Sequence, residues 1–267
     1  ARQLPGYFSF TSSYVEASNS SQPYSLLTII STLAWGLGYF GMPHILLRFM
    51  AIEDEQKLKI SRRVASIWVV IAMGVAVMIG VVGREMSSQG LVDSLTGSQT
   101  ETIIVRIADL LSKHGIFPAL MAGLILAGIL ASTMSTADSQ LLAAASSVSQ
   151  NILQEAFHLN LSKRASMIAA RLTVIVVAIL GVIIARDPNS SVFGIVSFAW
   201  AGFGAAFGPI VLFSLFWKRT TKEGALCGII AGGVTACIWW LKSGGIFDVY
   251  EIVPGFIVSA LVIVIVS

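Results

Sequence analysis

The amino-acid sequence predicts an all-α integral membrane protein, and three observations support this fold class. Of the 267 residues, 55% are hydrophobic and only 12% are charged, whereas about a quarter of an ordinary soluble domain is charged. Apolar runs recur at about the 20-residue length that a helix needs to cross a bilayer about 30 Å thick. Whole helical turns within these runs lack the polar face that a helix of a soluble protein would show.

Seven hydrophobic segments are predicted to form the membrane helices. They run over residues 25–47, 62–83, 117–150, 165–185, 192–217, 224–241 and 251–267. Residues 1–24 are polar and rich in serine, and we interpret them as an extracytoplasmic loop remnant, followed by one membrane domain over residues 25–267. The sequence starts without Met and stops inside an apolar run, so we expect a truncated chain whose last helix is cut short.

Two further regions, one loop and one hydrophobic segment, have features that an ordinary membrane helix or loop would lack. The segment "ETIIVRIADLLSKHG" within residues 84–116 has apolar residues at helical spacing, which predicts an amphipathic helix on one membrane face. Segment 117–150 would be about 50 Å long as a continuous helix, so it should tilt strongly or project into the cytoplasm.

Basic residues divide the loops between two sides of the membrane. Loops 48–63, 151–164 and 218–223 hold ten Lys or Arg, whereas loops 1–24, 84–116, 186–191 and 242–250 hold six in about twice the length. The positive-inside rule therefore places loops 48–61, 151–164 and 218–223 in the cytoplasm. The same clustering accounts for the net charge of +3 without a nucleic-acid partner.

The sequence lacks the motifs of several enzyme classes. No HExxH, no paired cysteines with metal-ligand spacing and no phosphate-binding Gly-Lys-Ser/Thr loop occurs, so metal hydrolysis and nucleotide hydrolysis lack their residues. Cys227 and Cys237 lie ten residues apart in one apolar run. We interpret them as small core residues rather than a disulfide or a metal site.

The first hydrophobic segment contains a predicted break. The stretch "WGLGYFGMPH" holds Gly36, Gly38, Gly41 and Pro43 within eight residues. Glycine weakens a helix and proline removes a hydrogen-bond donor, so the helix should unwind here. Irregular backbone at membrane depth is tolerated only beside protein or a cavity, and in transporters it marks the substrate site.

Two aromatic residues flank this break. Trp35 and Tyr39 are four residues apart and would share a face of an intact helix. Beside free backbone groups they would wall a cavity for a small amphoteric solute. The alternative interpretation is an aromatic belt at the membrane interface.

A polar stripe interrupts the apolar segment 117–150. Its hydroxyls, those of Ser132, Ser135, Thr136 and Ser139, share one helical face, and Asp138 lies at the edge. Hydroxyl and carbonyl oxygens could form a weak, exchangeable Na⁺ site. The alternative is packing between helices, where Ser and Thr are common. Asp138 favours a functional role, since an intramembrane carboxylate costs a few kcal/mol, although it could pair structurally with an arginine or a backbone amide.

A second motif holds small residues. In "SFAWAGFGAAFGP", Gly204 and Gly208 have GxxxG spacing. This spacing favours tight helix packing, and a gating hinge is the alternative.

Three long motifs carry a resemblance to a known family. The segments "WGLGYFGMPHILLRFMAI", "MSTADSQLLAAASS" and "VSFAWAGFGAAFGPIVLFSLFWKR" occur in this order. They closely resemble the sodium/solute symporter family, and within it the sodium/proline symporters. The resemblance implies a leucine-transporter-like inverted-repeat fold, of which this chain would hold the second repeat plus two flanking helices. The first repeat would lie in the missing N-terminal half.

The resemblance also implies sodium-binding residues. Ser135 and Thr136 match the family's sodium-binding hydroxyl pair, and Ser132 matches a position that contributes its backbone carbonyl. Asp138 and Ser139 fall at the positions of a second sodium site in some members.

Substrate-binding residues are implied in the same way. Trp35 and Tyr39 match the aromatic pair assigned to proline, and Gly38 lies between them. Met42 stands where glutamine would be expected from the resemblance.

The function implied is the C-terminal part of a Na⁺-coupled secondary symporter of the bacterial inner membrane, which imports L-proline by alternating access. Its partners would be the solute, Na⁺ as the coupling ion, the bilayer and the missing half, with no cofactor. Two alternatives stay open: a symporter-like sensor domain fused to a signalling kinase, and a Na⁺ symporter for another small solute such as pantothenate. An intramembrane enzyme ranks last, since Asp138 has no obvious catalytic partner in a second segment.

Overall fold

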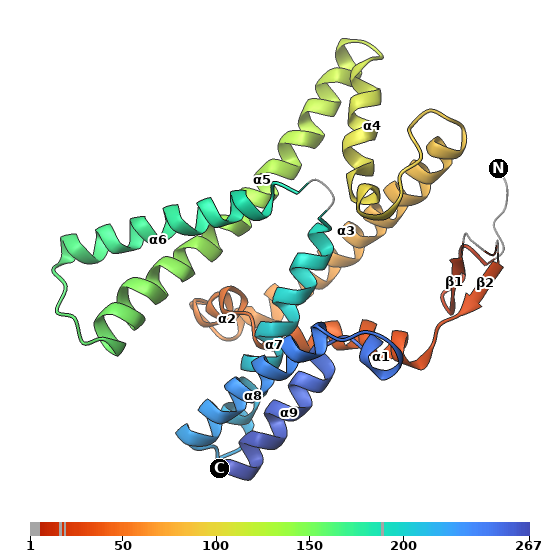
Figure 1. Cartoon of the computed structure of the whole chain (residues 1–267). Coiled ribbons are helices and arrows are strands. Elements are labelled where there is room, and N and C mark those ends of the chain that lie inside the picture. Colours follow the sequence, from red (N-terminus) through yellow and green to blue (C-terminus); the bar gives the residue numbers. More distant parts are fainter. Residues whose placement is uncertain (1–5, 16–17, 19, 188–189) are drawn as a thin grey trace. The chain divides into compact units, whose positions relative to one another are not determined.

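The computed structural model describes residues 6–15, 18, 20–187 and 190–267. Its chain divides into two compact units (Figure 1). Unit 1 combines Ala1–Leu47 with Phe193–Ser267, and unit 2 is Arg48–Val192.

Unit 1 begins with a short hairpin and continues with helices from both ends of the sequence. Strands β1 (Ser12–Val15) and β2 (Ser20–Pro23) pair antiparallel, with Ser12 opposite Pro23. The helical elements are α1 (Leu26–Ala34), the 3₁₀ helix η2 (Trp35–Phe40), α2 (Pro43–Met50), α7 (Val192–Phe216), α8 (Lys222–Trp240), the 3₁₀ helix η5 (Gly245–Asp248) and α9 (Ile252–Val266). Helix α2 continues beyond Leu47 into unit 2.

Unit 2 consists of long helices with short connections. In chain order they are α3 (Lys57–Ser88), the 3₁₀ helix η3 (Gly97–Thr102), α4 (Ile103–Ser112), α5 (Ile116–Ser146), the π-helix η4 (Ser147–Ala156) and α6 (Lys163–Ile184). Helix α5 packs against α4 and α6.

Each predicted hydrophobic segment forms one or more helices. Within the described residues, five helices are long and apolar enough to cross a membrane, and the bent pair Leu26–Phe40 and Pro43–Met50 makes a sixth if it is counted as one span. Helix α9 is apolar but has 15 residues, about 22 Å, which is shorter than the hydrocarbon core of a bilayer. These helices confirm an all-α, multi-pass membrane protein.

The predicted break in the first segment is confirmed. The two helical parts bend by 53° around Gly41 and Met42. The glycine-rich stretch does not unwind completely, since Trp35–Phe40 forms a 3₁₀ helix whose end is closed by the Gly41 N–H bond to the Gly38 carbonyl, 3.0 Å. Upstream, the Ser25 hydroxyl caps α1 by accepting the Thr28 N–H at 3.1 Å.

The predicted amphipathic helix is present as α4. It lies against α5 and α3, and Ala108 on its inner face is almost fully buried. Gly83 of α3 allows α4 to approach closely, since a Cβ at Gly83 would overlap the side chain of Ile103 in α4. Just before α4, the Glu101 carboxylate accepts the Ser191 hydroxyl at 2.6 Å and the Val192 N–H at 2.9 Å, which ties η3 to the first residue of α7.

The long segment 117–150 is longer than predicted. Helix α5 continues as the ten-residue π-helix η4, so the helical stretch reaches Ala156 and occupies the first part of the predicted loop 151–164. The side chain of Gln154 donates to the Ser149 carbonyl and the Ser166 hydroxyl, both at 3.0 Å, and so joins η4 to the start of α6.

Small residues allow α8 and α9 to lie side by side (Figure 1). Gly228 and Gly232 of α8 face Ile263 and Ser259 of α9, and a Cβ at either glycine would overlap or crowd these neighbours. Tight packing at Gly204 is also confirmed, since its Cβ would lie 2.8 Å from the Gly38 Cα.

The interpretation of the cysteines is wrong in one respect. Cys227 and Cys237 are free thiols, as predicted, but both are exposed. Buried glycines of α8 lie one residue beyond Cys227 and at position 232, so the small-residue face packs on α9 and the cysteines point elsewhere.

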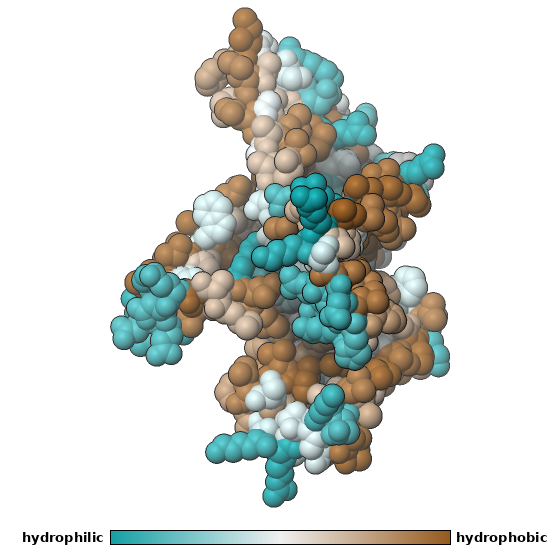
Figure 2. Space-filling model, turned by 90° about the vertical axis from the view of Figure 1, so that its left-hand side faces the viewer, coloured by the Kyte–Doolittle hydropathy of each residue, from teal (hydrophilic) through white to brown (hydrophobic). Residues whose placement is uncertain are grey.

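Apolar side chains dominate much of the surface. Figure 2 shows extended brown, hydrophobic regions on the face in view. In α3 and in α6, no residue of the most apolar 18-residue stretch is buried. Trp68 of α3, for example, is 68% exposed. A helix that is apolar all round and uncovered by its own chain is suited to lipid or to further helices.

Candidate functional site

An aromatic cluster surrounds the broken helix in unit 1. Its members are Trp35, Tyr39, Phe193, Trp200 and Tyr250. The Trp35 ring stacks on Phe193, Trp200 and Tyr250 with centroid distances of 5.4, 5.7 and 5.7 Å. Tyr39 meets Trp200 edge-on at 4.8 Å. Offset stacking and edge-on packing are the preferred arrangements of aromatic pairs.

Trp35 and Tyr39 do not share one helical face as expected, because residues Trp35–Phe40 form a 3₁₀ helix rather than an α-helix. With three residues per turn, positions four apart differ by about 120° in direction, compared with about 40° in an α-helix. Trp200 of α7 bridges this difference because its ring contacts both side chains. Trp35 is half-buried and Tyr39 is 50% exposed, so both keep accessible surface.

Hydrogen bonds fix the cluster to three elements. The Trp200 Nε1–H donates to the Trp35 carbonyl oxygen at 2.9 Å. The Tyr250 hydroxyl donates to the Ser197 carbonyl at 2.7 Å, and the Tyr250 N–H donates to the Ser31 hydroxyl at 2.9 Å. Burial and the neighbouring Glu251 carboxylate raise the pKa of Tyr250 above its usual value, so its hydroxyl stays a donor.

Gly38 and Met42, two other residues of the predicted substrate segment, are buried. Gly38 lies under the Trp200 indole, and a Cβ at Gly38 would overlap that ring. Met42 belongs to the hydrophobic core with Ala34, Trp200 and Ile252. Its apolar side chain fills the space in which a glutamine would need polar partners.

The predicted sodium ligands lie together on α5 of unit 2. Ser132, Ser135 and Thr136 are exposed within the chain. The Thr136 hydroxyl donates to the Ser132 carbonyl at 3.5 Å. This is the usual bond of a helical threonine or serine hydroxyl to the carbonyl four residues earlier, and it recurs at Thr133 and Ser139. The distance therefore gives two neighbouring oxygens but does not by itself indicate a cation.

The residues of the predicted second sodium site have a different environment. The Ser139 hydroxyl donates to the Ser135 carbonyl at 3.2 Å and accepts an N–H of Arg48 at 3.3 Å. A guanidinium beside Ser139 disfavours a second cation there. Asp138 is exposed on α5. Over the described residues no group of three His, Cys, Asp or Glu side chains could hold a metal ion.

The structure thus brings each predicted set together within its own unit. Trp35, Gly38 and Tyr39 belong to unit 1, whereas the stripe on α5 belongs to unit 2. Sequence reasoning missed Trp200 and Tyr250. The signal for Trp200 was present, as it is the single large polar-tipped aromatic among the small residues of "AWAGFGAA".

Glu251 provides a test of the packing around Tyr250. Burial raises the pKa of Glu251, which precedes α9 and makes no side-chain hydrogen bond to the first turn of that helix. A carboxyl group whose pKa is raised on folding favours the folded state below its unfolded pKa, and that stability is lost as pH rises through the folded pKa. We expect Glu251→Gln to raise the melting temperature in detergent at pH 8, with a smaller gain at pH 4. Equal gains at both pH values would contradict this.

The chain is similar to proteins of a known transporter family. The sequence model of the sodium:solute symporter family matches residues 6–232. Relatives include the high-affinity proline transporter PutP of Bacillus subtilis (41% identical), the sodium/proline symporter of Salmonella typhimurium (39%) and the osmoregulated proline transporter OpuE of Bacillus subtilis (40%). Each comparison covers 91% of this chain and 50%, 47% and 48% of the relative, respectively.

The chain therefore spans about half the length of the curated relatives that it matches. No solved structure matches it. The family match extends over most of the chain, from the hairpin to α8, and includes both the broken helix and the polar stripe. The chain belongs to the sodium:solute symporter family.

Proposed function

We propose that this chain is the C-terminal part of a Na⁺-coupled secondary symporter that imports L-proline by alternating access. The observation that carries this is the presence, in one family member, of both an oxygen-rich stripe on α5 and an aromatic pair on a broken helix. The similar proteins named above are proline transporters and sodium/proline symporters, which favours proline over a solute such as pantothenate and transport over a sensor role. The chemistry is transport, and the chain is not an enzyme.

The proposed architecture is the leucine-transporter-like inverted repeat. The helices from α1 to α7 would form the second repeat, and α8 and α9 would be the flanking helices. The exposed apolar faces of α3 and α6 support this, since they leave room for a first repeat and for lipid. The protein would lie in a bacterial inner membrane, with loops 48–61, 151–164 and 218–223 in the cytoplasm.

Sodium would bind to the hydroxyls of Ser135 and Thr136 and the carbonyl of Ser132. The exposure of all three residues on one face of α5 supports this arrangement. These neutral oxygens give a weak site, which suits an ion that must be released in each cycle. Further ligands would come from the first repeat. The Arg48 contact makes Asp138 and Ser139 the weaker candidates for a second site.

Proline would bind against Trp35 and Tyr39. The pyrrolidine ring suits their apolar faces, and its ammonium group suits the negative potential of an aromatic ring. Gly38, which has no side chain, would let the backbone of η2 approach the solute and Trp200 at once.

Coupling would follow from conformational preference. Na⁺ would hold α5 against the first repeat in the outward-open state, which completes the proline site. Each ligand then favours the conformation that the other needs, and the effect is reciprocal. Loss of Na⁺ to a low-sodium cytoplasm would release α5 and open the inner path.

The test is uptake of labelled L-proline into proteoliposomes by the full-length protein that carries this sequence. We expect uptake that depends on an inward Na⁺ gradient, and no uptake by residues 1–267 alone. Gradient-driven uptake of another solute, but not of proline, would keep the mechanism and reject the substrate. Proline uptake that does not depend on the Na⁺ gradient would show that Na⁺ is not the coupling ion.

A further inference from the structure

Trp200 makes three different contacts with the segment that carries the aromatic pair. Its indole N–H donates to the Trp35 carbonyl at 2.9 Å. Its ring stacks on the Trp35 ring with 5.7 Å between centroids and meets the Tyr39 ring edge-on at 4.8 Å. One side chain of α7 therefore anchors the first residue of η2 and touches both aromatic residues.

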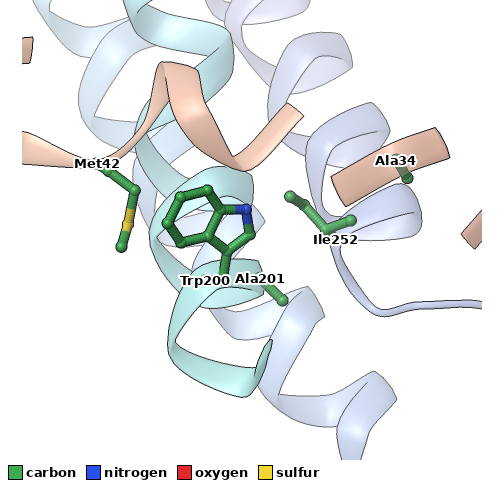
Figure 3. Close-up of a cluster of buried hydrophobic side chains, with 5 residues drawn as sticks. All are labelled: Ala34, Met42, Trp200, Ala201 and Ile252. Carbon is green, nitrogen blue, oxygen red and sulfur yellow. The ribbon is translucent and has the colours of Figure 1, made fainter. Parts of the chain in front are cut away.

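Trp200 is itself held by the core of unit 1. It is 9% exposed and packs with Ala34, Met42, Ala201 and Ile252. In the view of Figure 3 its indole lies between Met42 and Ile252, with the ring nitrogen on the Ile252 side. A side chain enclosed in this way has little rotamer freedom, so its contacts to η2 are made by a fixed partner.

The backbone of η2 is shaped to accept this indole. Gly38 lies between Trp35 and Tyr39 in the sequence, and a Cβ at Gly38 would overlap the Trp200 ring. Gly36, in the same 3₁₀ helix, has nothing within 4 Å of its Cβ position. Close approach is therefore needed at Gly38, where Trp200 packs, and not at Gly36.

We propose that Trp200 is a positioning residue that fixes Trp35 relative to Tyr39 and thereby sets the ring size of the solute that binds against them. This inference rests on the proposed function. Trp200 acts through the pair and need not touch the solute. Without its N–H the Trp35 carbonyl loses a donor, and with a smaller ring the two aromatic side chains can move apart.

The first experiment compares proline uptake by the full-length wild type and by Trp200→Phe, with Trp68→Phe as the matched control on the exposed face of α3. Replacement of the Trp200 indole by benzothiophene, which keeps the shape but lacks the N–H, guards against a folding defect. One buried hydrogen bond corresponds to about three- to tenfold in affinity. We expect the proline KM to rise by about that factor, with Vmax and the half-saturating Na⁺ concentration within about twofold of wild type.

Ring-size selectivity gives the second measurement. Pipecolate, the six-membered-ring homologue of proline, should compete better with proline in Trp200→Phe than in the wild type. An unchanged proline KM and unchanged selectivity in a folded Trp200→Phe variant would overturn the inference. A Trp68→Phe variant that behaves in the same way would also overturn it.

A third measurement separates this inference from the proposed function. In a cysteine-free background, the rate of maleimide labelling of Tyr39→Cys reports the position of η2 without any transport. We expect the benzothiophene replacement to change this rate at least about threefold. If the wild type takes up no proline, the proposed function fails, and an unchanged labelling rate overturns the positioning role on its own.

Discussion

Replacing Ser135 and Thr136 together with alanine is expected to raise the Na⁺ concentration for half-maximal proline uptake by about two to four orders of magnitude in the full-length protein. Each hydroxyl that contacts a charge contributes about 1.5–3 kcal/mol, and both are lost. The proline KM measured at saturating Na⁺ should change far less, because neither hydroxyl belongs to the aromatic cluster around η2. Uptake as a function of Na⁺ concentration in proteoliposomes measures both quantities.

Thr133→Ala is the matched control for this double variant. Thr133 has the same exposure and the same helix, and its hydroxyl bonds to the Ile129 carbonyl at 3.0 Å, but it lies off the stripe. It should leave the Na⁺ dependence unchanged. Two outcomes would contradict a sodium site: equal losses of Na⁺ and proline affinity in the double variant, or a Thr133→Ala variant that is as impaired as the double variant. Either result would indicate that the hydroxyls of the stripe serve packing between helices.

Gly41→Ala is expected to destabilise the protein strongly and to abolish uptake. A Cβ at Gly41 would overlap the Phe203 carbonyl oxygen and lie 2.8 Å from the Gly204 Cα, so it meets backbone that cannot rotate away. Overpacking of this kind costs about 1–3 kcal/mol, and more where backbone must separate. Thermal unfolding in detergent measures the loss.

Gly36→Ala serves as the control, since it adds the same methyl group within η2, five residues before Gly41, in open space. Its melting temperature should stay within about 2 °C of the wild type. If Gly36→Ala and Gly41→Ala were equally destabilised, the loss would reflect helix propensity in η2 rather than the approach of η2 to α7.

The sequence predicted the helices because their signal is local. Apolar runs define a membrane helix without knowledge of its neighbours, and glycines with a proline define the break in the same way. The polar stripe was also predictable, because a helix turns by a fixed angle per residue and so determines which hydroxyls share a face.

Contacts between distant parts of the chain were not predictable in this way. The Trp200–Trp35 hydrogen bond joins residues 165 positions apart, and nothing near Trp200 in the sequence specifies its partner. The exposure of Cys227 and Cys237 depends on which face of α8 meets α9, which is set by Gly228 and Gly232 together with the residues that they face. The π-helical continuation of α5 left no signal in the pattern of apolar residues.

Because α5 is long, a small rotation about its midpoint moves its end much further than it moves the residues near its middle. With 31 residues it is about 46 Å long. If it pivots by about 10° around its midpoint, Thr136 moves by about 1.3 Å and Ser146 at its end by about 4 Å. A rearrangement no larger than the capture of one ion would thus be magnified about threefold where α5 joins η4. The Gln154 bonds to Ser149 and Ser166 would carry that displacement on to α6.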